Sequence, residues 1–382
     1  MRQELDWISI EGFKSIATTG KVELRPINLI IGPNGSGKSN FIGIFAFLQA
    51  IKEGKLYEYV RTAGGADELL HFGTKNTSEI KIRLSFSDAV NGYSLSLKAD
   101  AEDNLFPLNE ETTFWDKSKY PRPYSNLLAP MKSGTEAGIS NQNLSKSTGE
   151  WVRTRLDRWR LYHVHDTSSN SPLRKTARVD DSDFLRPDGS NIAAFLYRLK
   201  QTKEYANSYS LIRKTIQRVA PFFDDFLLRP DNLNTEVIKL AWKHTSSDKY
   251  FGASAFSDGT LRFIALATLF LQPLELRPSV ILVDEPELGL HPSAITLLAS
   301  LIRQTSLETQ IIVSTQSPLL LDHFAPEDVL VANRVNSATT LTRLDSATLE
   351  NWLEDYSLGQ LWEKNELGGR PASENIKSTK SE

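Results

Sequence analysis

An octapeptide near the N-terminus has the residue types and the spacing of a phosphate-binding loop. Residues 32–39 read Gly-Pro-Asn-Gly-Ser-Gly-Lys-Ser and fit the pattern G-x-x-x-x-G-K-[ST]. A short apolar run precedes the loop and a helical pattern follows it, which is the context that the pattern requires. The glycines allow backbone N–H groups to close around phosphate oxygens, and the helix N-terminus adds partial positive charge.

The polar groups of this loop have distinct expected roles. Lys38 is expected to reach the β- and γ-phosphates of a nucleotide, and Ser39 to ligate Mg²⁺. Lys38 therefore also counts among the expected catalytic residues. The residues of this segment that we expect to bind the cofactor are Asn34, Gly35, Ser36, Gly37, Lys38, Ser39 and Asn40.

Two carboxylates follow the apolar run Val280–Val283 directly. Asp284 and Glu285 are thereby placed at the C-terminal end of a buried strand, where α/β sheets bind ligands. Asp284 is expected to hold Mg²⁺ through water, and Glu285 to polarise the attacking water as a general base. A solvated acidic turn is the alternative, and the phosphate loop in the same chain favours the catalytic interpretation.

A third motif, Ser257-Asp258-Gly259-Thr260, opens an apolar helical pattern over residues 261–271. A serine at the N-cap together with a glycine leaves free N–H groups and a hydroxyl that can contact an anion. Taken alone, such a motif is only a capped helix. Its position some 20 residues ahead of the acidic strand favours contact of Ser257 and Gly259 with a nucleotide.

Taken together, the three motifs resemble an ABC-type ATPase of the SMC/RecF/OLD branch, with Asp-Glu-Pro-Glu-Leu-Gly-Leu-His-Pro at residues 284–292. The resemblance implies an α/β P-loop NTPase fold with an SMC-head-like mixed and parallel sheet and an inserted helical lobe. It implies that ATP and Mg²⁺ are the cofactors and that ATP is hydrolysed. It also implies a homodimer around two ATP molecules, in which Ser257 and Gly259 of one subunit contact the γ-phosphate held by the other.

Further stretches extend this resemblance over most of the chain outside residues 101–150. Residues 10–15, Ile-Glu-Gly-Phe-Lys-Ser, resemble the start of SMC and RecF heads. In those heads the adenine of the nucleotide packs after this stretch, and the resemblance therefore adds Lys14 to the expected cofactor-binding residues. The segments similar to a family of predicted stand-alone bacterial ATPases are 266–273, 285–292, 358–364 and 368–371.

Gln316 occupies a position at which relatives in this branch commonly carry histidine. It lies in Ser-Thr-Gln-Ser after the buried strand predicted at residues 310–313. Glutamine can donate an N–H to a phosphate and orient water with its carbonyl, but it cannot take up a proton near neutral pH. We predict that Gln316 is a catalytic residue that contacts the γ-phosphate; a glutamine that only holds the turn is the alternative.

The elements that position these residues follow from hydrophobic periodicity. Strands alternating with helices in the last third predict a parallel sheet covered on both faces. Asn91-Gly92 predicts a hairpin turn between two alternating runs. The expected strands are 7–10, 28–31, 80–86, 93–97, 159–165, 237–242, 280–283 and 310–313. The expected helices are 40–51, 192–199, 205–219, 261–271 and 294–302.

We expect four segments along the 382-residue chain. Residues 1–100 and 236–350 form the two parts of the ATPase head, and a polar tail covers residues 351–382. Residues 101–235 form an inserted lobe, which begins with an irregular stretch at 101–150. Heptads sustained enough for a coiled coil are missing from this lobe, so a compact helical lid is favoured.

Composition excludes several classes of protein. The chain has no cysteine, which excludes disulfides and thiolate metal sites, and its net charge of −3 gives no global basic field. No apolar run reaches the roughly 18 residues of a membrane span, and no signal peptide is evident, so we expect a cytoplasmic protein without membrane contact. His163 and His165 alternate on one strand, but no third and fourth ligand is apparent, which disfavours zinc.

The resemblance leaves the biological role open. A switch that regulates a partner effector or DNA is favoured, with antiviral defence as one setting. A RecF-type repair or recombination ATPase that binds DNA directly is an alternative, as is an ATPase that gates a nuclease centre on a separate Toprim-like subunit. A transporter motor is disfavoured because no Q-loop glutamine is assigned: Gln49 lies in a predicted helix and Gln142 in the irregular stretch.

Overall fold

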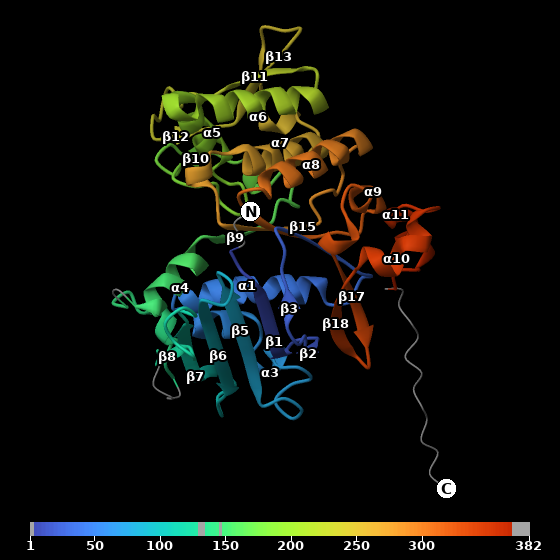
Figure 1. Ribbon diagram of the computed structural model, residues 1–382. Helices are drawn as coiled ribbons and strands as arrows, with labels where there is room; N and C mark the ends of the chain where they lie inside the picture. Colours follow the sequence, from blue (N-terminus) through green and yellow to red (C-terminus); the bar gives the residue numbers. More distant parts are fainter. Residues whose placement is uncertain (1–3, 129–133, 145–146, 369–382) are drawn as a thin grey trace. The chain divides into compact units, whose positions relative to one another are not determined.

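The computed structural model describes residues 4–128, 134–144 and 147–368 (Figure 1). The chain forms two compact units. The first, here the N-terminal unit, comprises Gln3–Arg158 and Ala325–Glu382. The second, here the central unit, comprises Trp159–Phe324 with Met1–Arg2. The phosphate loop belongs to the N-terminal unit, whereas the acidic strand, the serine-glycine motif and Gln316 belong to the central unit.

The N-terminal unit contains a seven-stranded antiparallel sheet in the order β2-β1-β5-β6-β7-β8, with β3 also paired to β1. A second group of strands has β17 parallel to β4 and antiparallel to β18. The strands of this unit are β1 (Trp7–Phe13), β2 (Ile16–Thr18), β3 (Val22–Glu23), β4 (Ile27–Ile31), β5 (Glu79–Phe86), β6 (Asn91–Ala99), β7 (Leu105–Phe114), β8 (Tyr124–Leu127), β17 (Val329–Val335) and β18 (Ala338–Arg343).

Helix α1 (Lys38–Lys52) anchors the core of this unit. Apolar residues bury more than one face of this helix, and the Phe47 ring stacks on Phe13 of β1 at 5.6 Å between centroids. The remaining helices of the unit are α2 (Leu56–Thr62), α3 (Ala66–Leu69), α4 (Thr148–Asp157), α10 (Ser346–Leu353) and α11 (Leu358–Lys364). Because α1 follows the phosphate loop directly, its burial fixes the direction in which the loop faces.

The central unit is built around β15, which pairs in parallel with β9 on one side and with β16 on the other. Its strands are β9 (Trp159–Tyr162), β10 (Ala177–Arg178), β11 (Phe223–Leu227), β12 (Val237–Ile238), β13 (Ala241–His244), β14 (Tyr250–Gly252), β15 (Val280–Asp284) and β16 (Gln310–Ser314). The pairs β10-β12 and the sheet β11-β13-β14 are antiparallel. The parallel group therefore brings three strand ends to one edge.

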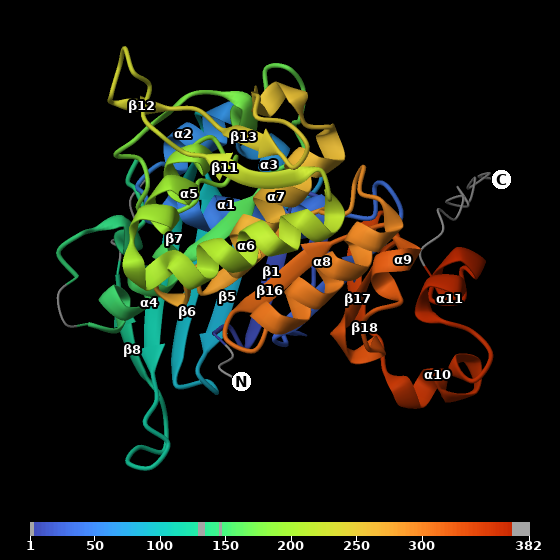
Figure 2. The same ribbon diagram turned by 90° about the horizontal axis from the view of Figure 1, so that it is seen from above.

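Helices cover the strands of the central unit. They are α5 (Ile192–Gln201), α6 (Ala206–Val219), α7 (Asp258–Leu271), α8 (Pro292–Thr305) and α9 (Pro318–Leu321). Figure 2 shows α6, α7 and α8 beside one another, and α7 contacts both of its neighbours. Every residue of α7 from Leu261 to Leu271 is buried, so this helix is held on all sides. Among the described residues, no helix is both long and apolar enough to cross a membrane.

The structure corrects the expectations for two stretches of the sequence. Asn91-Gly92 does not form the hairpin turn. Both residues belong to β6 and pair with β5, and residues 87–90 make the turn, with positive φ at Ser87, Asp88 and Ala89. The stretch 101–150 is not irregular throughout, since it contains β7, β8 and the start of α4.

Within the expected polar tail, Ser357 and Gln360 form a capping box at the start of α11. Residues 369–371 of the predicted family segment lie outside the described residues. The compact units divide the chain differently from the four expected segments, whose boundaries stay a prediction.

A buried carboxylate explains how part of the 101–150 stretch is ordered. Glu110 of β7 has no exposed surface and accepts hydrogen bonds from the Tyr93 hydroxyl and from the N–H groups of Gly138 and Ile139. Burial raises the pKa of this carboxyl group. Glu110 thus ties residues 138–139 to the sheet, and apolar periodicity could not have shown this.

Replacing Glu110 with alanine should destabilise the protein by about 3 kcal/mol, because it leaves buried donors without an acceptor. The free energy of unfolding in urea measures this effect. Glu111→Ala, on the same strand but only half-buried, is the matched control and should cost less than about 1 kcal/mol. Equal losses in the two variants would contradict the role given to Glu110.

The raised pKa of Glu110 also predicts a pH dependence. The folded protein holds a proton on Glu110 more readily than the unfolded chain, whose pKa is near 4.5. The contribution of Glu110 to stability therefore falls as pH rises above about 4.5. Relative to Glu110→Gln, which cannot ionise, the wild-type protein should lose stability from pH 4.5 upward. A pH-independent difference between the two proteins would refute this assignment.

Candidate active site

The phosphate loop connects β4 to α1 and depends on a glycine at its last turn. Gly37 is the N-cap of α1 with φ +100°, a conformation that L side chains rarely adopt. A Cβ atom built on Gly37 would lie 2.0 Å from Thr339 Oγ1. Both the backbone conformation and the close approach of β18 therefore require glycine here.

The loop has the donors that an anion needs. Helix α1 carries no acidic residue in its first turn, and the first N–H groups of any helix lack intrahelical acceptors. Lys38 is buried, and its Nζ donates to the carbonyls of Gly32 at 2.7 Å and Pro33 at 3.1 Å. Ser36 Oγ is buried and, within the described residues, has no hydrogen-bond partner. An anionic group such as a phosphate fits this set of donors.

A network of side-chain hydrogen bonds connects the phosphate loop to Ser15 and to Thr339 of β18. Asn40 Nδ2 donates to Ser15 Oγ at 2.7 Å, and the Ser15 and Thr339 hydroxyls lie 2.7 Å apart. Thr339 Oγ1 in turn donates to the carbonyl of Ser36 at 2.9 Å. The Asn40 side chain, expected to contact the cofactor, thus holds the neighbouring Ser15 in this structure. Ser15 and Thr339 are support residues that the loop pattern alone does not include.

Lys14 lies one residue from this network, in the turn between β1 and β2. Its φ is +49°, its carbonyl accepts from His71 Nδ1 at 2.7 Å, and its Nζ lies 5.7 Å from the centre of the Phe13 ring. It lines a pocket of about 520 Å³ together with Ala63, Asp67, Glu68, Leu70, Phe72 and Gly73. The expected contact of Lys14 with the cofactor stays a prediction.

In the central unit, the end of β15 presents the predicted acidic pair. Asp284 is the last residue of β15 and stands opposite Ser314 of β16, whose Oγ donates to Asp284 Oδ1. On the other side, His165 Nε2 lies 3.9 Å from Asp284 Oδ2. A half-buried carboxylate at a strand end is an oxygen ligand of the type that Mg²⁺ prefers.

Glu285 and Gln316 are brought together by the same strand pair. Glu285 has φ +38°, unusual for a residue other than glycine, and its N–H donates to the carbonyl of Ser314 at 2.9 Å. Its Oε1 accepts a hydrogen bond from Gln316 Nε2. The two residues therefore contact each other as a pair at the edge where the strands end.

A second carboxylate, not included in the sequence predictions, ties the two loops together beneath this pair. Glu287 is buried, and its Oε1 accepts from Thr315 Oγ1 at 2.5 Å and from the Gln316 N–H at 3.2 Å. Burial raises the pKa of Glu287. The sequence carries a signal for this residue, since Glu287 follows Asp284-Glu285-Pro286 directly.

The serine-glycine motif begins α7 as expected. Ser257 is the N-cap, its Oγ accepts from the Thr260 N–H at 3.3 Å, and the residue is exposed. A Cβ atom on Gly259 would lie 2.4 Å from the carbonyl oxygen of Gly289. The N-terminus of α7 therefore packs against the loop that follows the acidic pair, and only glycine fits there.

Other candidates from the sequence have structural partners. Gln49 Nε2 donates to the carbonyl of Leu156. His163 and His165 follow β9 with ring centres 6.5 Å apart, and burial lowers the pKa of His163. Across the described part of the chain, no group of three or more His, Cys, Asp or Glu residues could hold a metal ion.

A family model described as "AAA domain, putative AbiEii toxin, Type IV TA system" (AAA_21) matches residues 27–322. The chain belongs to this family. The match includes the phosphate loop, the serine-glycine motif, the acidic pair and Gln316. It supports the expectation of an ABC/SMC-type ATPase.

One curated protein is similar in sequence to part of this chain. The chain is 29% identical to the chromosome partition protein Smc of Halothermothrix orenii over 106 residues, which are 28% of this chain and 8% of that protein. The chain thus spans a small fraction of that curated relative.

Two solved structures share its fold. A Smc head bound to the C-winged helix domain of ScpA gives a TM-score of 0.56 at 16% identity, covering 92% of this chain and all of that one. A Smc head with an extended coiled coil, bound to the C-terminal domain of ScpA from Pyrococcus furiosus, gives 0.55 at 15% identity, covering 92% and 99%. The expected α/β P-loop NTPase fold of the SMC-head type is confirmed.

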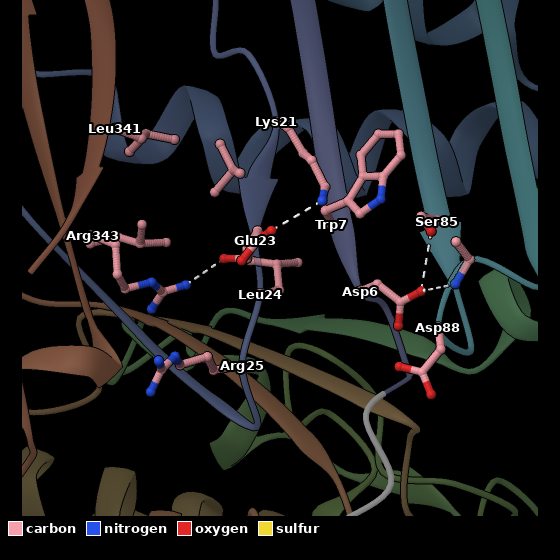
Figure 3. A pocket seen from close by; sticks show the side chains of 13 residues that line it. Asp6, Trp7, Lys21, Glu23, Leu24, Arg25, Ser85, Asp88, Leu341 and Arg343 are labelled. Carbon is pink, nitrogen blue, oxygen red and sulfur yellow. Dashed lines mark hydrogen bonds and ion pairs between the residues drawn. The ribbon is translucent and has the colours of Figure 1, made fainter. Parts of the chain in front are cut away.

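A further pocket of the N-terminal unit lies at the opposite end of the β4 and β17 strands from the phosphate loop. It has a volume of about 570 Å³, and Figure 3 shows its lining side chains. Lys21 Nζ pairs with Glu23 at 3.0 Å, and Arg343 Nη2 donates to the Glu23 carbonyl at 2.6 Å. Asp6 accepts from Ser85 and from the Ala89 N–H. These polar groups pair with one another, and none of the residues that line this pocket belongs to the three motifs.

The phosphate loop supplies a test that compares two of its own glycines. Gly37→Ala should cost about 3 kcal/mol of stability and abolish nucleotide binding, because it combines a strained φ with a clash. Gly35→Ala shares the positive φ but meets no atom within 4 Å, so it should cost about 1 kcal/mol. Urea unfolding and binding of a fluorescent ATP analogue measure both effects. Equal behaviour of the variants would contradict the described packing.

Proposed function

We propose that this AAA_21 protein binds and hydrolyses ATP and acts as a nucleotide-controlled switch. The observation that carries the proposal is the set of contacts at the ends of β15 and β16, where Ser314 holds Asp284 and Gln316 holds Glu285. A phosphate loop with intact backbone geometry in the same chain supports it.

In this proposal the phosphate loop binds the triphosphate. The backbone N–H groups of residues 35–39 donate to the β- and γ-phosphate oxygens, and Lys38 Nζ exchanges its bonds to Gly32 and Pro33 for a phosphate oxygen. The buried Ser36 hydroxyl, which lacks a partner among the described residues, gains an acceptor. Ser39 and Asp284 would hold Mg²⁺, which when bound neutralises the charge of the transferred phosphate.

Hydrolysis is assigned to Glu285 as the general base. Its carboxylate accepts a proton from the attacking water, while the amide of Gln316 keeps the carboxylate in one orientation. The strained backbone of Glu285 is consistent with a catalytic position, because residues in sparsely populated conformations often occur at active sites. Gln316 can also donate to the γ-phosphate when it releases Glu285.

The switch itself requires a second copy of the chain. We propose a homodimer in which Ser257 and Gly259 of one subunit contact the γ-phosphate bound by the other. The exposure of Ser257 at the N-terminus of α7 suits such a contact. Because the contact depends on the γ-phosphate, ATP favours the dimer and hydrolysis releases it.

The output of the switch is proposed to be a partner protein. Two Smc heads of this fold were solved with domains of ScpA bound. We infer that this chain likewise controls a separately encoded effector, with a Toprim-like nuclease subunit as the expected candidate and defence against viruses as the setting. Direct action on DNA would need a local basic surface, since the net charge is −3.

Glu285→Gln should lower the rate of ATP hydrolysis at least about 100-fold, because it removes the proton acceptor but leaves the fold and the phosphate loop intact. ATP affinity should stay within about threefold of wild type, and an ATP-dependent dimer should accumulate in light scattering after gel filtration. Glu275→Gln, an exposed glutamate of the same unit, is the matched control. Unchanged turnover without an ATP-bound dimer would refute the assignment.

Gln316→Ala should lower kcat about 10-fold, because Glu285 loses the hydrogen bond that orients its carboxylate. ATP binding should change much less, since the phosphate loop supplies most of it. Gln304→Ala, an exposed glutamine of α8, should leave both quantities unchanged. Steady-state kinetics with equilibrium binding separate the two effects, and equal turnover in Gln316→Ala would eliminate a catalytic role.

A further inference from the structure

The segment after β9 lies beside the end of the acidic strand β15. Tyr162, the last residue of β9, stands opposite Val283 of β15. The parallel pairing therefore delivers residues 163–165 to the level of Asp284. This segment contributes two imidazoles to the edge that already holds Asp284 and Glu285.

His165 faces the second oxygen of the Asp284 carboxylate. Ser314 Oγ donates to Oδ1 from β16, and His165 Nε2 lies 3.9 Å from Oδ2 on the β9 side. The carboxylate thus has a polar neighbour on each side, Ser314 of β16 and His165 of the segment after β9. Of the two side chains, about a third of His165 and a quarter of Asp284 are exposed, so water reaches the space between them.

We propose that His165 is a positioning residue for Asp284, holding the carboxylate in the orientation that binds the metal of Mg-ATP. Ser314 fixes one oxygen directly. His165 holds the other through one water, because the 3.9 Å between Nε2 and Oδ2 exceeds a direct hydrogen bond. Partners of metal ligands commonly orient them in this way, and removing such a partner typically weakens metal affinity 10- to 100-fold. The inference rests on the proposed function.

The backbone of this segment is held independently of the imidazole. Arg262 of α7 is buried, and its guanidinium donates to the carbonyls of Val164 at 3.1 Å and His165 at 2.7 Å. The N–H of His163 donates to the carbonyl of Pro187 at 3.0 Å. Removing the His165 side chain should therefore leave the segment and the fold in place.

Arg262, which holds this segment, also lies close to the loop after Glu287. A Cβ atom on Gly289 would lie 3.2 Å from Arg262 Nη1, so the guanidinium also borders the loop that follows Glu287. His165 is thus fixed between the start of α7 and the end of β15. In the described part of the chain no group of three or more His, Cys, Asp or Glu residues could hold a metal ion, and this includes the two imidazoles with Asp284.

The test uses Mn²⁺, whose free concentration is visible by electron paramagnetic resonance, as a probe of the metal site in the full-length protein. Mn²⁺ is titrated into protein saturated with a non-hydrolysable ATP analogue. His165→Ala should weaken Mn²⁺ binding about 10-fold, whereas analogue binding in EDTA should be unchanged. His165→Gln, which keeps an N–H donor, should restore part of the loss. His244→Ala, in β13, is the matched control and should match wild type.

The outcomes separate this inference from the proposed function. If the wild-type protein binds neither the analogue nor Mn²⁺ with it, the proposed function fails. If wild type binds both and His165→Ala binds Mn²⁺ equally well, the assignment of His165 is wrong. A large fall in the melting temperature of His165→Ala would also overturn it, because the backbone contacts of Arg262 would then not suffice to hold the segment.

Discussion

The parallel register of β15 between β9 and β16 is the constraint on which the proposed chemistry depends. It places Asp284 opposite Ser314 and brings the residues after Tyr162 to the same level. Side chains at the carboxyl ends of adjacent parallel strands meet at one edge, which is where such sheets bind ligands. A shift of one residue in either pairing would turn Asp284 to the other face and separate it from its partners.

Buried polar contacts keep this edge rigid. Glu287 accepts from Thr315 and from the Gln316 backbone, so the loop after β15 and the turn after β16 are held to each other. Burying a carboxylate is costly unless it is hydrogen-bonded, and the raised pKa of Glu287 reflects that cost. The contact of Gly259 with Gly289 joins α7 to the same loop. We infer that a ligand at the start of α7 can act on Glu285 through this short path.

Local motifs predicted the fold class, because each motif is a short pattern in a known context. The residues that hold the motif side chains in place were not predictable in the same way. Ser314 and His165 contact Asp284 only through strand pairing, and Thr339 reaches the phosphate loop from the far end of the chain. The strand β7 was missed because it contains a proline and a buried Glu110, which interrupt its apolar alternation.

The most direct test of the central claim is a crystal structure of the Glu285→Gln protein with ATP and Mg²⁺. The account predicts the triphosphate at the backbone N–H groups of residues 35–39 and one metal ion shared by Ser39 and Asp284. It further predicts Ser257 of a second copy at the γ-phosphate. A triphosphate bound elsewhere, or a metal ion remote from Asp284, would contradict it.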